Sequence, residues 1–256
     1  MPHPPTEILL CVVAFTAGFL DAVVGGGGLV QLPGMMILLP RTGIPTLFGT
    51  NKLVSITGTF LAATQYARRV RLERGVTLAA VLSAFAFSIV GASAVSLLHP
   101  QVLRPLVLVM LIVVAVITAL RRDLGVDHAP KHVGHRGVGF AVIVGGVMGF
   151  YDGFFGPGTG TFLVFAFVSL FGFDFLSASA TAKCVNVATN LAALIVFSAT
   201  GHVLYLVAIP MIACNMLGSF AGVRLAMLRG NVFVRQLFLV VVSVMIAKLA
   251  WDTFGA

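Results

Sequence analysis

Long apolar runs, separated by short polar stretches, decide which folds are open to this chain. Of its 256 residues, 59% are hydrophobic and 9% are charged, whereas a soluble domain carries roughly 25% charged residues. The surplus apolar surface must therefore face lipid, and a run of about 20 residues can cross a bilayer as a helix. The long helices that we expect cover Ile8–Val24, Thr46–Tyr66, Thr77–Leu98, Leu103–Leu120, Val138–Phe155, Leu176–Ala199, Leu204–Leu225 and Val232–Trp251.

Two other apolar segments, Leu29–Leu39 and Thr161–Phe171, are too short to span a membrane. At about 1.5 Å per residue, each covers only about half of the hydrocarbon thickness. Each follows a glycine-rich stretch, so we predict half-helices or re-entrant pieces that begin at a broken helix. Non-helical backbone at membrane depth is tolerated only where protein or a water-filled cavity covers it, so each break should be buried in the bundle.

A carboxylate followed by a glycine-rich stretch occurs twice. Asp21 precedes Gly25–Gly28, and 131 positions later Asp152 precedes Gly156–Gly160. The match continues at the same offset, without a gap, from Thr50, Lys52, Ser88, Gly91 and Arg104 to Thr181, Lys183, Ser219, Gly222 and Arg235. We therefore predict an all-α polytopic membrane protein of two homologous repeats, each of about five segments with a broken or half-helix after its glycine motif. Residues 1–125 form repeat 1, 126–137 a cytoplasmic linker and 138–256 repeat 2.

The basic residues favour inverted repeats. Five segments per half invert the second half, place both termini outside and put most loop arginines inside, as the positive-inside rule requires. Four crossings per half would make the halves parallel and move outside three arginines, Arg224, Arg229 and Arg235, which fits the rule less well. The net charge of +8 thus reflects topology. No basic stripe with aromatic residues points to a nucleic-acid partner.

Asp21 and Asp152 are candidates for function, because an ionised carboxylate inside a membrane is costly and usually functional. The competing interpretation is structural, since aspartate also hydrogen-bonds the backbone at helix breaks. The two roles are compatible, and either residue could carry a coupling proton or shape its break.

Lys52 and Lys183 are the other matched charges, each about six residues into an apolar run. A lysine there could snorkel to the membrane interface. A site is the better interpretation, because polar residues continue at helical spacing along one face of each helix, and such faces line bundle interiors or pathways. These faces are Thr50, Lys52, Ser55 and Thr59 in the first half, and Thr181, Lys183, Asn186 and Asn190 in the second.

The glycine stretches predict an anion site. Glycine permits close backbone approach, and the helix after each stretch begins with free N–H groups and a partial positive charge that bind anions. Tight helix packing through small residues is the simpler alternative. The substrate-binding residues that we predict are Gly25, Gly26, Gly27, Gly28, Thr50, Asn51, Lys52, Gly156, Gly158, Thr159, Gly160, Thr181, Lys183, Asn186 and Asn190.

No pattern indicates a cofactor, a metal or an enzyme active site. The three cysteines lie inside apolar runs, which argues against disulfides and zinc. His128, His132 and His135 fall in the polar linker, where a solvated loop is the better interpretation. No catalytic triad, P-loop or dinucleotide motif is present. Aromatic residues at the ends of runs are typical interfacial anchors: Tyr66, Tyr205 and Trp251.

Two motifs of the first half, with their second copies at 149–160 and 181–183, resemble those of the TauE/SafE sulfite-exporter family. They are Ala17-Gly18-Phe19-x-Asp21-Ala22-x-x-Gly25-Gly26-Gly27-Gly28-Leu29 and Gly49-Thr50-Asn51-Lys52-Leu53. The resemblance spans essentially the whole chain. It implies a secondary transporter of small sulfur-containing or organic anions, usually an exporter, with its sites on these repeat motifs. The halves differ, because Pro157 interrupts the second glycine stretch and Ala182 stands where the first half has Asn51.

The expected function is transport of a small anion across the inner (cytoplasmic) membrane by alternating access between the repeats. A passive anion channel is an alternative from another class, and an intramembrane enzyme or assembly factor is a third. The sequence leaves proton coupling, substrate, direction and oligomeric state open, a homodimer included.

Overall fold

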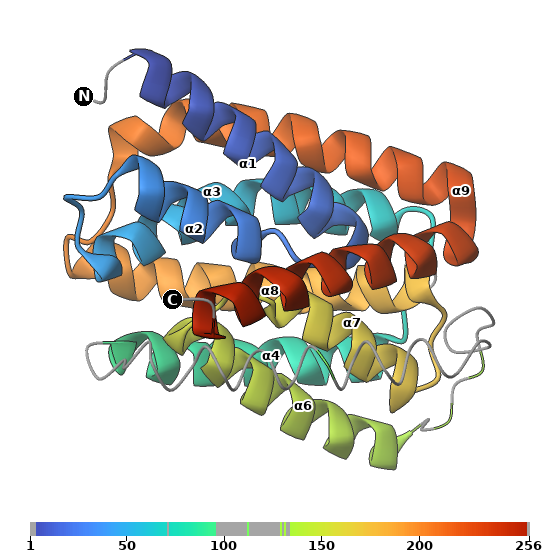
Figure 1. Ribbon diagram of the computed structural model, residues 1–256. Helices are drawn as coiled ribbons and strands as arrows, with labels where there is room; N and C mark the ends of the chain where they lie inside the picture. The colour runs from blue at the N-terminus through green and yellow to red at the C-terminus, as the bar shows by residue number, and fades with distance from the viewer. Residues whose placement is uncertain are drawn as a thin grey trace.

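The computed structural model describes residues 4–70, 72–95, 112, 129, 131 and 134–254, and throughout these residues its regular structure is helical (Figure 1). The expected helix at Leu103–Leu120 and most of the linker at 126–137, with His128 and His132, lie outside the described residues. The helices are α1 (Pro4–Val24), α2 (Gly28–Leu38), α3 (Ile44–Ala67), α4 (Arg74–Ser93), α6 (His135–Phe154), α7 (Thr159–Ser169), α8 (Phe175–Ala199) and α9 (Tyr205–Phe254).

The helix lengths agree with the apolar runs. Within the described chain, α1, α4, α6, α8 and α9 are long and apolar enough to cross a membrane. The predicted short helices are confirmed, because α2 and α7 have 11 residues each. The 24-residue α3 is also long, but its polar face keeps it out of that apolar group. These features describe a multi-pass membrane protein.

α9 consists of two arms rather than one rod. Gly230 has a non-helical φ of 72° inside it. The chain reverses there, so the second arm runs back along the molecule (Figure 1). The two arms correspond to the two helices predicted at Leu204–Leu225 and Val232–Trp251.

The helices follow the sequence repeat residue by residue. α1, α2, α3 and α4 begin at residues 4, 28, 44 and 74, and α6, α7, α8 and α9 begin at 135, 159, 175 and 205. Each start in the second half thus lies 131 positions after its counterpart. Among the described residues, a long, a short and two further long helices therefore follow one another twice, at the spacing of the sequence repeat.

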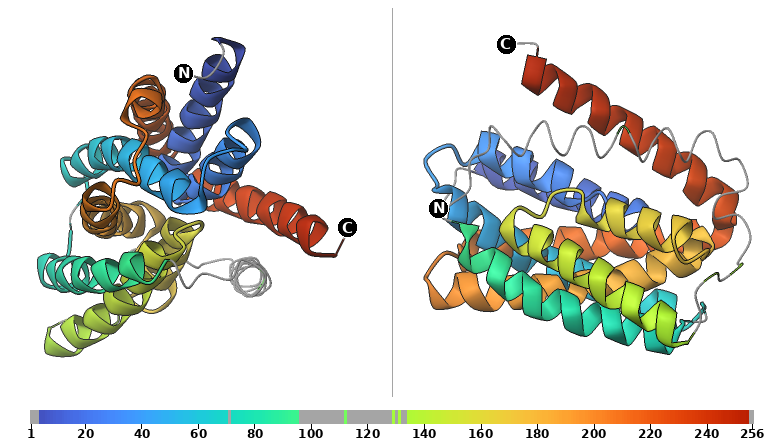
Figure 2. Two further views of the ribbon diagram at one scale, coloured as in Figure 1. Left: turned by 90° about the vertical axis from the view of Figure 1, so that its left-hand side faces the viewer. Right: turned by 90° about the horizontal axis from the view of Figure 1, so that it is seen from below.

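The outer helices of each half pack against outer helices of the other half. The most extensive interfaces are α4 with α6 and α1 with the first arm of α9, and each joins helices from different halves. α3 and α8 also pack on each other. The end-on view in Figure 2 shows α4 and α6 on one side of the bundle and α1 with α9 on the other, with α3 and α8 between them. We call α1–α9 and α4–α6 the outer pairs, and α3–α8 the inner pair.

Small residues allow the outer pairs to approach closely. A Cβ on Gly149 of α6 would overlap the backbone of Ala84 in α4, and a Cβ on Gly18 of α1 would overlap the backbone of Asn215 in α9. These two contacts are counterparts at the 131-residue offset. Close backbone approach through glycine is typical of membrane helix packing, where no water drives apolar surfaces together.

Hydrogen bonds repeat in the same reciprocal way between outer and inner helices. Ser88 of α4 donates to the carbonyl of Thr189 in α8 at 2.9 Å. Its counterpart Ser219 of α9 donates to the carbonyl of Gly58 in α3 at 2.6 Å. In both cases an outer helix is therefore tied to the inner helix of the other half.

α8 lies at the centre of the bundle. In its most apolar 18-residue stretch, 67% is buried, against 39% in the corresponding stretch of each other candidate membrane span. One anchor prediction was wrong: Tyr66 is fully buried and donates its hydroxyl to the carbonyl of Ala22 at 3.0 Å. Its position at the end of a run suggested the interface, but α1 covers it. Tyr205 and Trp251 are exposed, as anchors require.

Candidate anion site at the paired helix breaks

Both helix breaks depend on glycine at equivalent positions. Gly25 ends the turn after α1 with φ 82°, and Gly156 follows α6 with φ 90°. Only glycine adopts this left-handed region without strain. The breaks also meet: a Cβ on Gly25 would overlap the backbone of Gly160, and a Cβ on Gly160 would overlap that of Gly25. The sequence therefore brings the two motifs into direct backbone contact.

Lys52 of α3 forms a buried ion pair with Asp152 of α6. Its Nζ lies 2.6 Å from Asp152 Oδ2, and the two side chains are 5% and 6% exposed. This bond links the inner helix of the first half to an outer helix of the second.

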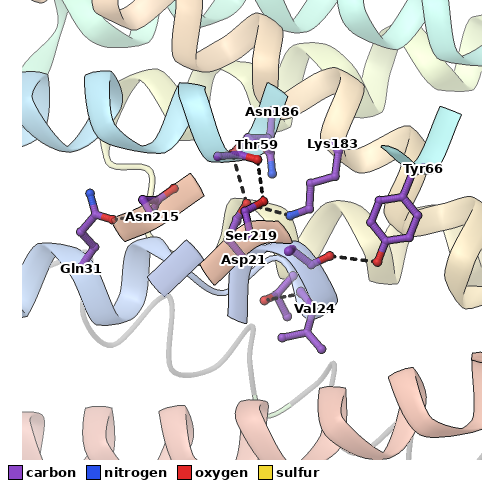
Figure 3. A network of polar contacts seen from close by, with 12 residues as sticks. Asp21, Val24, Gln31, Thr59, Tyr66, Lys183, Asn186, Asn215 and Ser219 are labelled. Carbon is purple, nitrogen blue, oxygen red and sulfur yellow. Dashed lines mark hydrogen bonds and ion pairs between the residues drawn. The ribbon is translucent and has the colours of Figure 1, made fainter. Parts of the chain in front are cut away.

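Lys183 of α8 pairs in the same way with Asp21 of α1, at 2.9 Å. Lys183 is fully buried, whereas the side chain of Asp21 is 19% exposed. The hydroxyl of Thr59 also donates to Asp21 Oδ2 at 3.1 Å, so that lysine and threonine converge on one carboxylate oxygen (Figure 3).

The two ion pairs are counterparts, since Lys183 and Asp152 follow Lys52 and Asp21 by 131 positions. Each lysine therefore binds the aspartate of the other half. Neither lysine snorkels, because both are buried. The hydrogen bonds that the two carboxylates make with described residues come from side chains, not from the backbone of the breaks. The charges thus join the halves as well as lying at the breaks.

A small cavity lies between the breaks. Its volume is about 30 Å³, counted as the space open to the centre of a water molecule. Three ionisable side chains line it: Lys52, Asp152 and Asp21. The other lining residues are Gly25, Gly28, Asn51, Ser55, Thr59, Gly156, Gly158, Thr159, Gly160, Asn186 and Asn190. Most of the predicted site residues therefore surround one space.

Several residues that line this cavity carry polar groups without a hydrogen-bond partner among the described residues. The N–H groups of Gly28 and Gly160, at the starts of α2 and α7, make no backbone hydrogen bond to a described residue. The side-chain oxygens of Asn51 and Asn186 are buried and have no partner among the described residues. Buried polar groups are nearly always hydrogen-bonded, so these donors and acceptors suit a polar ligand or ordered water.

Five predicted site residues do not line the cavity: Gly26, Gly27, Thr50, Thr181 and Lys183. Two of them, Thr50 and Thr181, use their hydroxyls in hydrogen bonds to backbone groups. The Thr50 hydroxyl donates to the carbonyl of Thr46 and accepts from the N–H of Leu204, and the Thr181 hydroxyl donates to the carbonyl of Ser177. Lys183 reaches the cavity only through Asp21.

Some polar contacts near the site escaped sequence reasoning. The amide of Asn215 in α9 donates to the side-chain oxygen of Gln31 in α2 at 3.1 Å, and both residues are buried. Tyr151 donates its hydroxyl to the carbonyl of Pro157 at 2.7 Å and so braces the second break. Isolated polar residues in apolar runs were the available signal, but they have no matching partner at the repeat offset.

Comparison with known proteins identifies the family. The profile described as sulfite exporter TauE/SafE matches residues 10–249. This chain belongs to the TauE/SafE family. Among its TauE/SafE relatives, "Probable membrane transporter protein YfcA" of Escherichia coli strain K12 is 34% identical over 96% of this chain and 90% of the relative. "Probable membrane transporter protein ORF9" of a Sinorhizobium species is 37% identical over 93% and 89%.

A third TauE/SafE relative, "Probable membrane transporter protein" of Haemophilus influenzae, is 30% identical over 96% of this chain and 94% of the relative. No solved structure matches the chain. Among the described residues, no group of three His, Cys, Asp or Glu side chains is placed to hold a metal ion.

Proposed function

We propose that this chain is a secondary transporter of small organic or sulfur-containing anions, such as sulfite or a sulfonate. It lies in the cytoplasmic membrane, its two halves have inverted topology, and both termini face outside. The observation that carries the proposal is a small cavity lined by a lysine, by residues at the starts of two half-helices and by a set of polar side chains.

Three kinds of group would attract the anion. Lys52 supplies a full positive charge, and the starts of α2 and α7 each add roughly half a charge from their helix dipoles. The unpaired N–H groups of Gly28 and Gly160 supply directed hydrogen bonds. Half-helices that point their positive ends at an anionic substrate recur in transporters with inverted repeats.

Asp152 holds the place on Lys52 that a substrate anion would take. Since about 10–15 Å³ in this measure holds one water, the cavity accepts only water-sized groups. A polyatomic anion therefore requires both a wider cavity and a lysine released by its carboxylate. Substrate binding and separation of the Lys52–Asp152 pair are then one event.

Charge balance indicates that a proton binds together with the substrate anion. The two lysines and two aspartates sum to zero, and a monoanion would leave one uncompensated charge in a buried site, which is costly. Protonation of Asp152, as the substrate replaces it on Lys52, restores neutrality. We therefore expect one proton to move with each monoanion.

The packing of outer helices from one half against those of the other favours some movements of the helices over others. If the sequence halves rocked as rigid bodies, both outer pairs would come apart, although they form the most extensive interfaces. The outer pairs α1–α9 and α4–α6 can each move intact against the inner pair. Alternating access between the repeats then takes the form of movements of these pairs.

Uptake into proteoliposomes tests the proposal. Sulfite, sulfate, a sulfonate and a carboxylate are offered to wild-type protein and to Lys52→Ala, with Lys131→Ala as a control that removes an exposed charge. We expect uptake of at least one anion that Lys52→Ala abolishes and Lys131→Ala leaves unchanged. Uptake that survives both Lys52→Ala and Lys183→Ala would refute the lysine assignment.

A pH gradient separates a coupled transporter from a passive channel. Accumulation of the anion against its own gradient, driven by a proton gradient, excludes a channel. Asp152→Asn should abolish this proton-driven accumulation, while exchange of the anion at equal pH on both sides continues. Passive equilibration that ignores the proton gradient would contradict the proposed coupling.

A further inference from the structure

A pocket far larger than the central cavity lies between the end of α3 and the first arm of α9. Its volume is about 450 Å³. Three arginines line it: Arg68, Arg69 and Arg224. The other lining residues are Gln65, Phe220, Val223, Met227 and Leu228. None of these lines the central cavity, so this arginine pocket is a separate feature of the molecule.

Among the described residues, nothing compensates the positive charge of the arginine pocket. No acidic residue lines it, and none of its three arginines forms an ion pair with another described residue. All three side chains are exposed. The guanidinium group binds phosphate through paired hydrogen bonds, and it does so better than a lysine ammonium.

A buried donor points to the same kind of ligand. Gln65 lines the pocket, and its amide nitrogen is buried and has no hydrogen-bond partner among the described residues. An acceptor oxygen placed among the three guanidinium groups would satisfy it. The pocket therefore suits an anion with several oxygen acceptors.

The apolar wall of the pocket lies on the first arm of α9, and exposed apolar side chains continue along this arm. Phe220 is 48% exposed and Leu228 is 73% exposed. Leu217, about one turn earlier on the same arm, is 63% exposed. A ligand that uses both walls has an oxygen-rich anionic head and hydrocarbon chains.

The position of the pocket fits the surface of a bilayer. Arg68 caps the C-terminus of α3, and Arg224 lies about two turns before Gly230, where α9 reverses. The pocket thus lies where membrane helices end and lipid headgroups begin. Basic pockets between membrane helices at this level are typical sites for anionic lipid headgroups.

We propose that the arginine pocket binds the phosphodiester headgroup of an anionic phospholipid, whose acyl chains lie along α9 at Phe220 and Leu228. The arginines would hold the phosphate and Gln65 would donate to one of its oxygens. Because the pocket touches an inner helix and an outer pair at once, bound lipid would stabilise their contact. This inference does not depend on the transport proposal.

The test compares lipids on the purified full-length protein in detergent. Phosphatidylglycerol and phosphatidylcholine of equal chain length are titrated, with binding followed by native mass spectrometry, and glycerol 3-phosphate serves as the soluble phosphate. We expect preference for phosphatidylglycerol and no comparable binding of glycerol 3-phosphate. Equal binding of the two lipids, or equal binding of the soluble phosphate, would overturn the proposal.

Variants locate the binding. Each arginine should contribute about fivefold to affinity, so Arg68→Ala/Arg69→Ala/Arg224→Ala should weaken phosphatidylglycerol binding about a hundredfold if the effects add. The matched control Arg41→Ala/Arg136→Ala/Arg229→Ala removes three exposed arginines outside the pocket and should change it little. Equal losses in the two triple variants would show a diffuse charge effect and refute a pocket.

Loss of three arginines could also disturb membrane insertion, because such residues set topology. The lysine triple Arg68→Lys/Arg69→Lys/Arg224→Lys keeps the charge and removes the guanidinium geometry. It should insert normally and bind phosphatidylglycerol less tightly than the wild type. Wild-type affinity in this variant would contradict recognition by the guanidinium groups.

Discussion

The two ion pairs should differ in how much they stabilise the fold, because a different carboxylate is left behind in each. Removing one partner of a buried pair costs about 3–5 kcal/mol, since the other charge stays buried without compensation. Asp152 is 6% exposed, and without Lys52 it would have no hydrogen bond to a described residue, so Lys52→Met should cost about 5 kcal/mol. Asp21 is 19% exposed, and without Lys183 it would keep the Thr59 hydroxyl, so Lys183→Met should cost about 3 kcal/mol.

Thermal unfolding of the purified protein in one detergent measures this difference. A loss of 1 kcal/mol lowers Tm by about 2–4 °C in a chain of this size. The Tm of Lys52→Met should therefore fall by about 10–20 °C, and that of Lys183→Met by about 6–12 °C. Methionine keeps most of the lysine's length, so the change is chiefly one of charge. Lys131→Met, which removes an exposed lysine, should shift Tm by no more than about 2 °C.

The neutral double variants decide whether the reasoning is sound. Lys52→Met/Asp152→Asn and Lys183→Met/Asp21→Asn leave no buried charge without a partner, so each should recover most of the stability that the single lysine variant loses. If each double variant instead loses the sum of its two single effects, the pairs are not coupled. If Lys183→Met is the more damaging single substitution, the argument from exposure is wrong.

Three further predictions use other contacts. Gly149→Ala should destabilise the protein, because the added Cβ would overlap the α4 backbone. In the same helix, the Cβ of Gly139→Ala would meet open space, so this variant should be neutral or more stable by up to about 1 kcal/mol. Thermal unfolding of both variants checks this difference. Tyr66→Phe should cost about 1–3 kcal/mol by the same measurement, since it leaves a buried carbonyl of α1 without its donor. Cys11 of α1 and Cys214 of α9 line the same surface pocket between these two helices. Joining them with a short thiol cross-linker, in a variant that lacks the third cysteine, should leave transport intact if this outer pair moves as a unit. If the cross-linker abolishes transport but has no effect on a Cys11→Ser control, the outer pair does not move as a unit.

Local sequence properties predicted most of the architecture. Apolar length located the described helices, and the glycine stretches located both half-helices, because a chain in lipid must satisfy its backbone hydrogen bonds within each helix. The repeat offset added that Asp21 and Asp152 occupy equivalent positions, as do Lys52 and Lys183. Most of the predicted residues then proved to surround one cavity.

Partners across the fold were beyond the reach of the sequence. The offset says that Lys52 and Lys183 are equivalent, but not which aspartate each would bind, because that depends on how the halves interleave. Tyr66 shows the same gap: its place at the end of a run suggested an interface, and only the packing of α1 over it reveals a buried donor. Residues outside the repeat pattern, such as Gln31, gave still less warning of their partners.

The geometry of the ion pairs suggests why the site would open to one side at a time. Asp21 joins the α1–α9 outer pair to α8, and Asp152 joins the α4–α6 outer pair to α3, with α3 and α8 between them (Figure 2). Movement of one outer pair therefore breaks one ion pair and leaves the other in place. Breaking both at once would cost about 6–10 kcal/mol, twice the cost of one. One anion with one proton can neutralise only one broken pair, so we infer that the second pair keeps the opposite side closed while the first is open.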